Sequence, residues 1–152
     1  MRPAVTYNER LAVPWWWWPV GLAIAVVAAA EIHGGTGGPL RSVLPYVVLP
    51  GLTALVLTVS SRSRVRLVDG VLHVPGARLP VSAIGALTAL DPTGVRRWLG
   101  PLAQPWAFVA LRPWLQTGVR VELDDRADDT PYWLIGSRRP AELVAALEDA
   151  RG

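Results

Sequence analysis

The chain has 152 residues, of which 51% are hydrophobic and 18% charged, and its formal net charge is +3. This apolar composition points first to membrane segments, and the lack of cysteine excludes a disulfide framework, a thiolate metal site and a cysteine nucleophile. Residues 64–152 hold eleven arginines against ten acidic residues, so clustered positive charge for binding nucleic acid is not predicted.

Two apolar stretches dominate the N-terminal part. One covers residues 15–32, with Glu31 as its single charge, and the other covers residues 43–59 without a charge. As helices they reach roughly 25–27 Å, close to the thickness of a bilayer core. A turn rich in glycine, from His33 to Pro39, separates them. Residues 1–63 are therefore predicted to form a membrane anchor, a transmembrane hairpin with helices over about 15–32 and 43–59.

Four consecutive tryptophans open the first stretch: Trp15, Trp16, Trp17 and Trp18. In a helix, successive residues turn by about 100°, so four adjacent indoles would ring the axis and not share a face. Indole favours the boundary between headgroups and acyl chains. The block predicts a membrane-interface anchor, with packing against the neighbouring domain as the alternative.

Arginine placement predicts the orientation of this hairpin. Arginines flank it on the terminal sides, at Arg2, Arg10, Arg62, Arg64 and Arg66, whereas Arg41 alone lies by the turn. The positive-inside rule then places both termini in the cytoplasm. We expect a multi-pass protein of the inner (plasma) membrane, in contact with the lipid bilayer.

Two alternatives concern the first stretch. Ala28 to Ala30 resembles a signal-peptidase site, although the tryptophan block and Pro19 are a poor start for the apolar core of a signal peptide. Gly21, Ala25 and Ala29 form a stripe of small residues that allows close helix packing. Its partner is either the second stretch of the same chain or another protomer in a homo-oligomer.

After Arg62 the pattern changes to short alternating stretches typical of strands. Asp69-Gly70 between residues 65–68 and 71–74 predicts a two-residue hairpin. Residues 79–90 predict a further strand region, whereas residues 91–105 hold three prolines and two glycines and predict a long loop.

Three more strands are predicted over residues 106–112, 118–123 and 132–136. A helix follows from Pro140, with Leu143, Val144 and Leu147 on one face. The fold class is therefore α+β. Residues 64–152 are expected to form a cytoplasmic domain, a small antiparallel β-barrel or meander of about six strands capped by the C-terminal helix.

Residues typical of catalysis are scarce. His33 and His73 each stand alone, without the paired spacing of a metal site. The acidic stretch from Glu122 to Asp129 lacks the spacing of a calcium loop and predicts a solvated hairpin loop. We predict no catalytic residue, no cofactor and no metal, and therefore no enzyme.

Arginine and aromatic residues recur together in the second part of the chain, beginning with Arg96, Arg97 and Trp98. Arginine binds carboxylate or phosphate through two hydrogen bonds, and tryptophan lies along apolar or interfacial surfaces. The candidate ligand or partner surface consists of Arg112, Trp114, Tyr132, Trp133, Arg138 and Arg139. Alternatively, Trp106 and Trp133 fill the core while the arginines pair with nearby acidic residues.

Two resemblances rest on short motifs. The hairpin at Asp69-Gly70 and the segment 79–84 resemble bacterial pleckstrin-homology-like (PH-like) domains, which implies a bent antiparallel barrel with a C-terminal helix. A second set of motifs covers nearly the whole chain: Tyr7-Asn-Glu9-Arg10-Leu11 with the tryptophan block, Asp91-Pro92 with Arg96, Arg112-Pro113-Trp114, Asp128-Asp129-Thr130-Pro131-Tyr132-Trp133 and Ser137-Arg138-Arg139-Pro140. With these motifs the chain is similar to a family of actinobacterial two-span membrane proteins without an established activity.

The sequence as a whole predicts a non-enzymatic interaction or scaffold protein, anchored in the membrane and presenting a PH-like domain to a protein partner. A first alternative is recognition of an anionic lipid headgroup or lipid-linked phosphate by the arginine and tryptophan surface. A second, less favoured alternative is an accessory subunit of an enzyme acting on envelope lipids.

Overall fold

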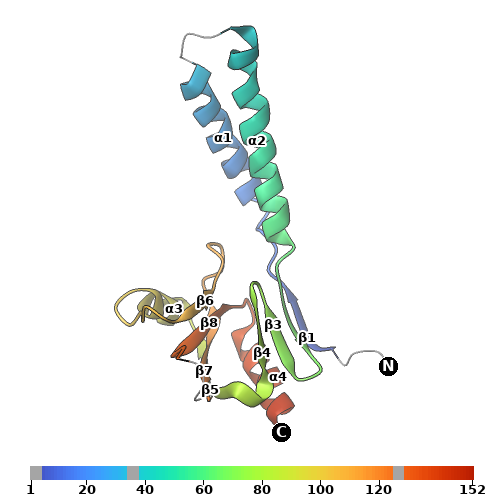
Figure 1. The fold of residues 1–152 in the computed structure, drawn as a ribbon, viewed down its shortest axis with the longest axis vertical. Helices are drawn as coiled ribbons and strands as arrows, with labels where there is room; N and C mark the ends of the chain where they lie inside the picture. Colours follow the sequence, from blue (N-terminus) through green and yellow to red (C-terminus); the bar gives the residue numbers. More distant parts are fainter. Residues whose placement is uncertain (1–4, 34–37, 125–128) are drawn as a thin grey trace. The chain divides into compact units, whose positions relative to one another are not determined.

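A computed structural model describes residues 5–33, 38–124 and 129–152 (Figure 1). The chain divides into two compact units: Ala12–Arg62, which is helical, and Met1–Leu11 together with Ser63–Gly152, which combines strands and helices. The segment before the helices therefore belongs with the C-terminal unit. This corrects the boundary expected at residue 63, which had placed residues 1–11 in the anchor.

The helical unit contains two apolar helices, α1 (Trp17–His33) and α2 (Pro39–Ser61). They pack through the stripe of small residues, of which Ala25 and Ala29 are buried. A Cβ atom added to Gly21 would lie 3.3 Å from Thr53 Cγ2 of α2. The stripe thus packs against α2 of the same chain, which is one of the two partners predicted for it.

Only α2, with 23 residues, is both long and apolar enough to cross a membrane among the described helices, while α1 has 17 residues and is shorter. The helix α1 begins at Trp17, and Trp15 and Trp16 lie in a turn before it. The expected single-turn ring of four indoles is therefore wrong in its geometry, since only Trp17 and Trp18 are helical. The anchoring role of the block stays a prediction.

The first sheet has the order β1-β2-β3-β4 and is antiparallel throughout. Its strands are β1 (Val5–Arg10), β2 (Arg64–Val68), β3 (Val71–Val74) and β4 (Ala77–Pro80). The predicted turn between β2 and β3 is confirmed, because Asp69 and Gly70 have φ angles of 49° and 72°, as a type I′ turn requires. The strand β1 was not predicted; it pairs with β2 across the whole helical segment.

The second sheet has the order β5-β7-β8-β6. Its strands are β5 (Ile84–Leu90), β6 (Phe108–Ala110), β7 (Gly118–Leu123) and β8 (Tyr132–Gly136), and a short 3-10 turn, Val81–Ala83, leads into β5. The pair β6 and β8 is parallel, so the sheet is mixed. The expected antiparallel barrel is wrong: in the part of the chain that the structure describes, the two sheets remain separate.

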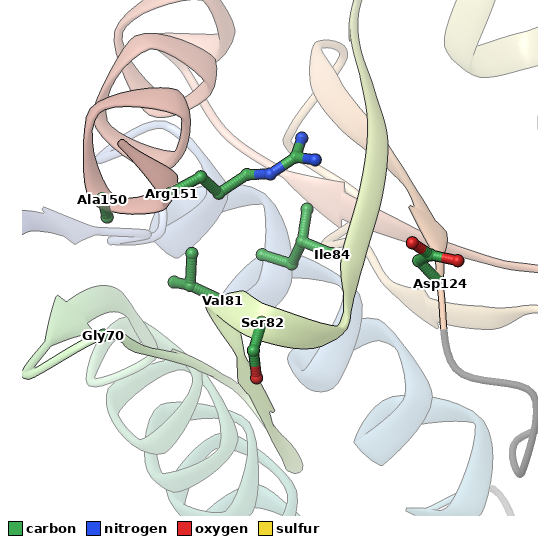
Figure 2. Close-up of a pocket in the computed structure, with 7 residues that line it drawn as sticks. All are labelled: Gly70, Val81, Ser82, Ile84, Asp124, Ala150 and Arg151. Atoms are coloured by element: carbon green, nitrogen blue, oxygen red, sulfur yellow. The ribbon is translucent and has the colours of Figure 1, made fainter.

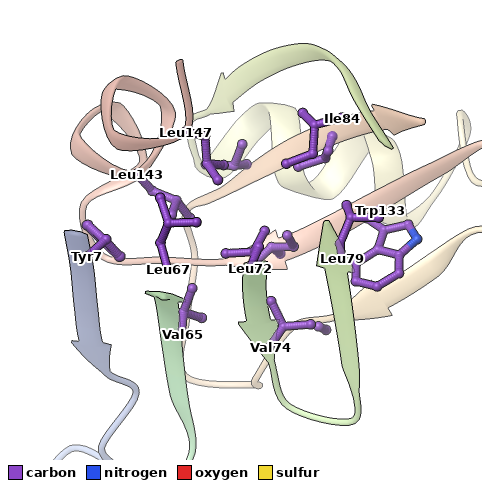
Figure 3. Close-up of a cluster of buried hydrophobic side chains, with 14 of the residues drawn as sticks. Tyr7, Val65, Leu67, Leu72, Val74, Leu79, Ile84, Trp133, Leu143 and Leu147 are labelled. Atoms are coloured by element: carbon purple, nitrogen blue, oxygen red, sulfur yellow. The ribbon is translucent and has the colours of Figure 1, made fainter. Parts of the chain in front are cut away.

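One hydrophobic core joins both sheets and α4 (Pro140–Arg151), as Figure 3 shows. The first sheet contributes Leu67 and Leu72, the second Trp133, and α4 Leu143 and Leu147. The predicted C-terminal helix is therefore confirmed, with Pro140 in its first turn, where its missing N–H is tolerated.

The other face of the second sheet is covered by α3 (Pro92–Leu99), in the region expected to be a loop. Asp91 caps this helix, since its Oδ1 accepts a hydrogen bond of 2.6 Å from Gly94 N, and Pro92 occupies the first turn. Val95 is buried against Leu90 and Leu134. In this region Pro92 therefore lies at the start of a short helix and Gly100 at its end.

Candidate functional site

The six residues of the predicted ligand surface lie in three different surroundings. Tyr132 and Trp133 are buried on opposite faces of β8, with exposed fractions of 1% and 7%. Trp133 belongs to the main core and packs on Phe108, with ring centroids 4.4 Å apart. Tyr132 lies in the smaller cluster under α3. Trp133 thus fills the core, as the alternative interpretation expected.

Arg112 and Trp114 form hydrogen bonds with the two residues at which the chain leaves the α+β unit and returns to it. The indole N–H of Trp114 donates to the carbonyl of Leu11, at 3.2 Å, and Arg112 Nη2 donates to Ser63 Oγ, at 2.7 Å. Leu11 and Ser63 are themselves joined, since Leu11 N donates to Ser63 O at 2.9 Å. We call these four residues the neck. The Arg-Pro-Trp motif therefore stabilises the two points of the α+β unit between which the helical segment is inserted.

Arg138 and Arg139 adjoin a buried carboxyl group, that of Glu9 in β1. Glu9 is 4% exposed and accepts three hydrogen bonds: from Tyr7 OH (2.8 Å), from Ser137 Oγ (2.6 Å) and from the backbone N–H of Arg138 (2.8 Å). Arg139 N donates in turn to Ser137 Oγ, at 3.0 Å. Both arginine side chains are exposed, and Arg139 pairs with Glu142 on α4.

This Glu9 centre changes the acidity of its neighbour. Burial, in the first place, raises the pKa of the Tyr7 phenol to about 12, and the hydrogen bond to Glu9 acts in the same direction, while the contact with Ser137 opposes it. The centre joins Tyr7 and Glu9, from one end of the sequence, to Ser137, from the other. Because every oxygen of Glu9 has a donor within the protein, the arrangement is that of a structural link between β1 and the start of α4.

A second polar group, not predicted from the sequence, lies under α3. The guanidinium carbon of Arg120 lies 4.1 Å from the ring centroid of Trp98 and 5.5 Å from that of Tyr132, and its Nη2 pairs with Glu122. The two aromatic rings meet edge to face, 4.9 Å apart. The available signal was the alternation of arginine and glutamate in 118–123, which places Arg120 and Glu122 on one face of β7.

An open hollow of about 460 Å³ lies at the end of α4 (Figure 2). Gly70, Ser82, Asp124 and Arg151 are among its lining residues, and Figure 2 shows the Arg151 side chain reaching over toward β5. There its Nη1 donates to Gly85 O at 2.7 Å. The hollow thus combines one arginine, already engaged with the backbone, and one carboxyl group, which gives no clear preference for a charged ligand.

The large apolar side chains that remain exposed gather elsewhere. Within the described part of the α+β unit they are Leu99, Leu102, Trp106 and Val109. Trp106 is 80% exposed, so the expectation that it fills the core is wrong. Leu99 and Leu102 belong to the predicted loop, residues 91–105, whereas Trp106 and Val109 belong to the predicted strand over 106–112. None of the four was part of the candidate ligand surface.

The candidate metal ligands in the sequence are the two histidines and the acidic stretch from Glu122 to Asp129. Among the described residues, no group of three histidine, aspartate or glutamate side chains is placed to hold a metal ion. Asp125 and Asp128 of the acidic stretch lie outside the described residues. His33 Nδ1 contacts Ser42 O at 3.2 Å within the helical unit, and His73 lies in β3.

The fold and its polar groups define an α+β protein with an inserted pair of apolar helices, one of them long enough to cross a membrane. Residues 6–147 match the family described as protein of unknown function (DUF3093), and the chain belongs to this family. The match extends from β1 to α4 and so includes Glu9, the neck and Ser137. No curated protein and no solved structure matches the chain.

Proposed function

We propose that the chain is an integral membrane protein whose helices α1 and α2 cross the inner (plasma) membrane as a hairpin and whose α+β unit acts at the cytoplasmic face as a non-enzymatic interaction domain. One observation carries the proposal: Leu11 and Ser63, which bound the helical segment, are hydrogen-bonded to each other.

This contact constrains the number of membrane crossings. The strands β1 and β2 are paired up to Arg10 and Arg64, so both ends of the helical segment lie on the same side of any membrane that the segment crosses. A segment that leaves and returns on one side crosses an even number of times. If α2 spans the bilayer, α1 has to return the chain, despite its 17 residues.

The surfaces of the two helices support a lipid environment. Leu57 is the one residue of α2 that is buried, while Val47, Leu52 and Leu55 are each more than half exposed. Apolar side chains around the whole circumference of a helix are typical of membrane spans, whereas helices at a water surface have a polar face. Ser61 and Thr58 donate their hydroxyls to carbonyls one turn earlier, as polar groups in a bilayer do.

The signal-peptide alternative conflicts with the position of β1. Cleavage after Ala30 would remove β1 from the first sheet, together with Leu11, which is fully buried in the core, and Glu9, which links β1 to α4. Loss of these contacts would open the core of the α+β unit. The structure therefore favours retention of the N-terminal segment.

The interaction role is supported by the state of the polar groups. The carboxyl group of Glu9 is saturated by donors of the same chain, and Arg112 and Trp114 serve the neck. The exposed apolar residues around Trp106, in contrast, have no role in the core.

Cysteine labelling in cells tests the topology, because the natural chain has no cysteine. A Leu40→Cys variant reports on the start of α2, and an Ala145→Cys variant reports on α4; both positions are exposed. With a membrane-impermeant maleimide, we expect the cysteine at 40 to react in intact cells and the cysteine at 145 only after permeabilisation. Reaction at 145 in intact cells would contradict the cytoplasmic placement.

A further inference from the structure

The large exposed apolar side chains in the described part of the α+β unit lie close together in the sequence. Leu99, Leu102, Trp106 and Val109 are 50%, 47%, 80% and 47% exposed, and they are all of the large exposed hydrophobic residues in the described part of this unit. Isolated apolar residues on a surface are ordinary, but a group confined to eleven consecutive residues, 99–109, indicates a contact surface.

The segment is held in place by its inner side. Val95 is buried, Trp98 stacks on Arg120, and Asp91 caps the helix. Beyond α3, Leu102 N donates to Arg97 O at 2.9 Å, and Gln104 N donates to Tyr132 OH at 3.2 Å. The outward residues are therefore presented by an ordered segment whose core contacts are already complete.

The charge of the same segment is positive. Arg96 and Arg97 are both exposed, and residues 92–109 contain no acidic side chain. Leucine and tryptophan next to arginine match the layered chemistry of an anionic bilayer, in which acyl chains take leucine, the interface takes indole and phosphates take guanidinium groups. A protein partner with a matching acidic and apolar groove would have to be supplied from solution, whereas the proposed hairpin keeps a bilayer permanently within reach.

We propose that Arg96, Arg97, Leu99, Leu102 and Trp106, here called the α3 edge, dock the α+β unit onto the surface of an anionic lipid bilayer. The inference rests on the proposed membrane insertion for the proximity of the bilayer. It assigns lipid contact to residues other than the predicted arginine and tryptophan surface. Of the aromatic members of that surface, Tyr132 and Trp133 are buried and Trp114 belongs to the neck. Docking would fix the orientation of the α+β unit at the membrane.

The test uses the full chain reconstituted in vesicles with single cysteines that carry an environment-sensitive fluorophore. Leu102→Cys reports on the α3 edge, Ala145→Cys on α4, and Val47→Cys on the membrane insertion of α2; all three positions are exposed in the structure. Quenching by nitroxide-labelled lipid is measured in vesicles with phosphatidylglycerol and in vesicles of phosphatidylcholine alone. We expect the fluorophore at 102 to be quenched in the anionic vesicles and the fluorophore at 145 to stay unquenched in both.

Charge variants identify the contact. Arg96→Gln with Arg97→Gln should lower the ratio of docked to undocked protein by about 25-fold, at roughly fivefold for each arginine near an anionic surface. The matched control is Arg66→Gln with Arg78→Gln, two exposed arginines of the first sheet, which should leave quenching at 102 unchanged. As a second probe, Trp106→Ser should weaken quenching at 102 without disturbing the core, because the indole is 80% exposed.

The two proposals fail in different ways. Quenching at 47 without quenching at 102 in anionic vesicles would overturn docking by the α3 edge and leave the hairpin intact. Absence of quenching at 47 would overturn the membrane hairpin itself. Equal quenching at 102 in neutral and anionic vesicles, unaffected by the arginine variants, would refute the specific requirement for anionic lipid.

Discussion

Large apolar side chains are mostly exposed in the helical unit of this chain and mostly buried in the α+β unit. In Ala12–Arg62, α2 buries only Leu57, and most of its other valines and leucines are exposed. In the α+β unit, leucines and valines such as Leu67, Val119 and Leu143 are fully buried. The same residue types are thus exposed in one unit and buried in the other, as expected if the proposed hairpin lies in a bilayer.

The chain passes from one unit to the other at the neck. There Leu11 and Ser63 are joined to each other, and Trp114 and Arg112 hold them with side-chain hydrogen bonds. An indole and a guanidinium group suit this position because both combine an apolar body with polar N–H donors. If the proposal is right, a charged substitution on the surface of α2 should be costly, whereas one on the surface of the α+β unit should not.

The largest effect is expected from a charge placed on α2. Leu52→Arg puts a guanidinium group at a site that is 53% exposed, at an estimated cost of about 3 to 4 kcal/mol if the surroundings are the bilayer centre. The matched control is Ala145→Arg on an exposed position of α4, which should change little. Resistance to carbonate extraction of membranes measures the outcome. Equal extraction of both variants and the natural chain would contradict a lipid environment for α2.

Loss of the Glu9 carboxyl group should have the next largest effect, in the α+β unit. Glu9→Ala leaves the hydroxyls of Tyr7 and Ser137 and the N–H of Arg138 without their acceptor, which we expect to cost about 3 kcal/mol. Asn8→Ala, at the exposed neighbouring position of β1, is the control and should cost little. Thermal unfolding of the full chain in detergent measures both. A similar melting temperature for the two variants would refute the structural role of Glu9.

The sequence predicted strands where two signals agreed. Gly118–Leu123 and Tyr132–Gly136 have the predicted bounds, since alternation or dense aromatic and β-branched residues coincide with turn residues on both sides. The strand β1 was missed because its partner β2 follows 51 residues of helical insertion, Ala12–Arg62, and its six residues have no hairpin signal of their own. Pairing across an insertion is a tertiary property that local patterns do not contain.

The candidate site was harder to predict than the fold. Arginine and tryptophan suggested a surface, yet identical residue types are used for the neck, the core and the exposed edge, and the choice depends on burial. Trp133 and Trp106 illustrate this, with exposed fractions of 7% and 80%. The sequence of α3 predicts a loop because its capping signal, Asp91-Pro92, stands among residues that usually end helices.

The Tyr7 phenol should make the stability of the α+β unit depend on pH. Its pKa in the folded protein, about 12, lies above the ordinary value of 10.0, so folding favours the protonated form. The corresponding stability is complete below pH 10 and is lost as the pH rises through 12, by about 2.5 kcal/mol at most. Relative to the natural chain, Tyr7→Phe should be less stable at neutral pH and should lose less stability between pH 10 and 12. Denaturant unfolding at both pH values measures the difference; parallel losses would contradict it.

Alanine substitutions at one glycine in each unit probe how tightly the two units are packed. In β7, a Cβ atom on Gly118 would collide with the carbonyl oxygen of Ile135, a backbone atom that cannot rotate away, so Gly118→Ala should cost about 2 kcal/mol. In α2, Gly51 has no heavy atom within 4 Å of the corresponding position, so Gly51→Ala should be neutral or slightly stabilising. Thermal unfolding in detergent would distinguish them, and an equal loss for both would show that Gly51 faces a neighbour that the single chain lacks.

The smallest effect concerns the cap of α3, and it connects stability to the proposed docking. Asp91→Ala removes the acceptor for Gly94 N and should cost about 1 kcal/mol, because Pro92 still favours a helical start. Thr93→Ala, at an exposed position in the first turn of α3, is the matched control. Since the cap orders the segment that carries Leu99 and Trp106, the fluorophore at 102 should be quenched less in anionic vesicles with Asp91→Ala, and unchanged with Thr93→Ala. Quenching that is unchanged in both variants, although Asp91→Ala lowers the stability as expected, would show that lipid contact does not require an ordered α3. The α3 edge would then act as a flexible apolar segment instead of a preformed surface.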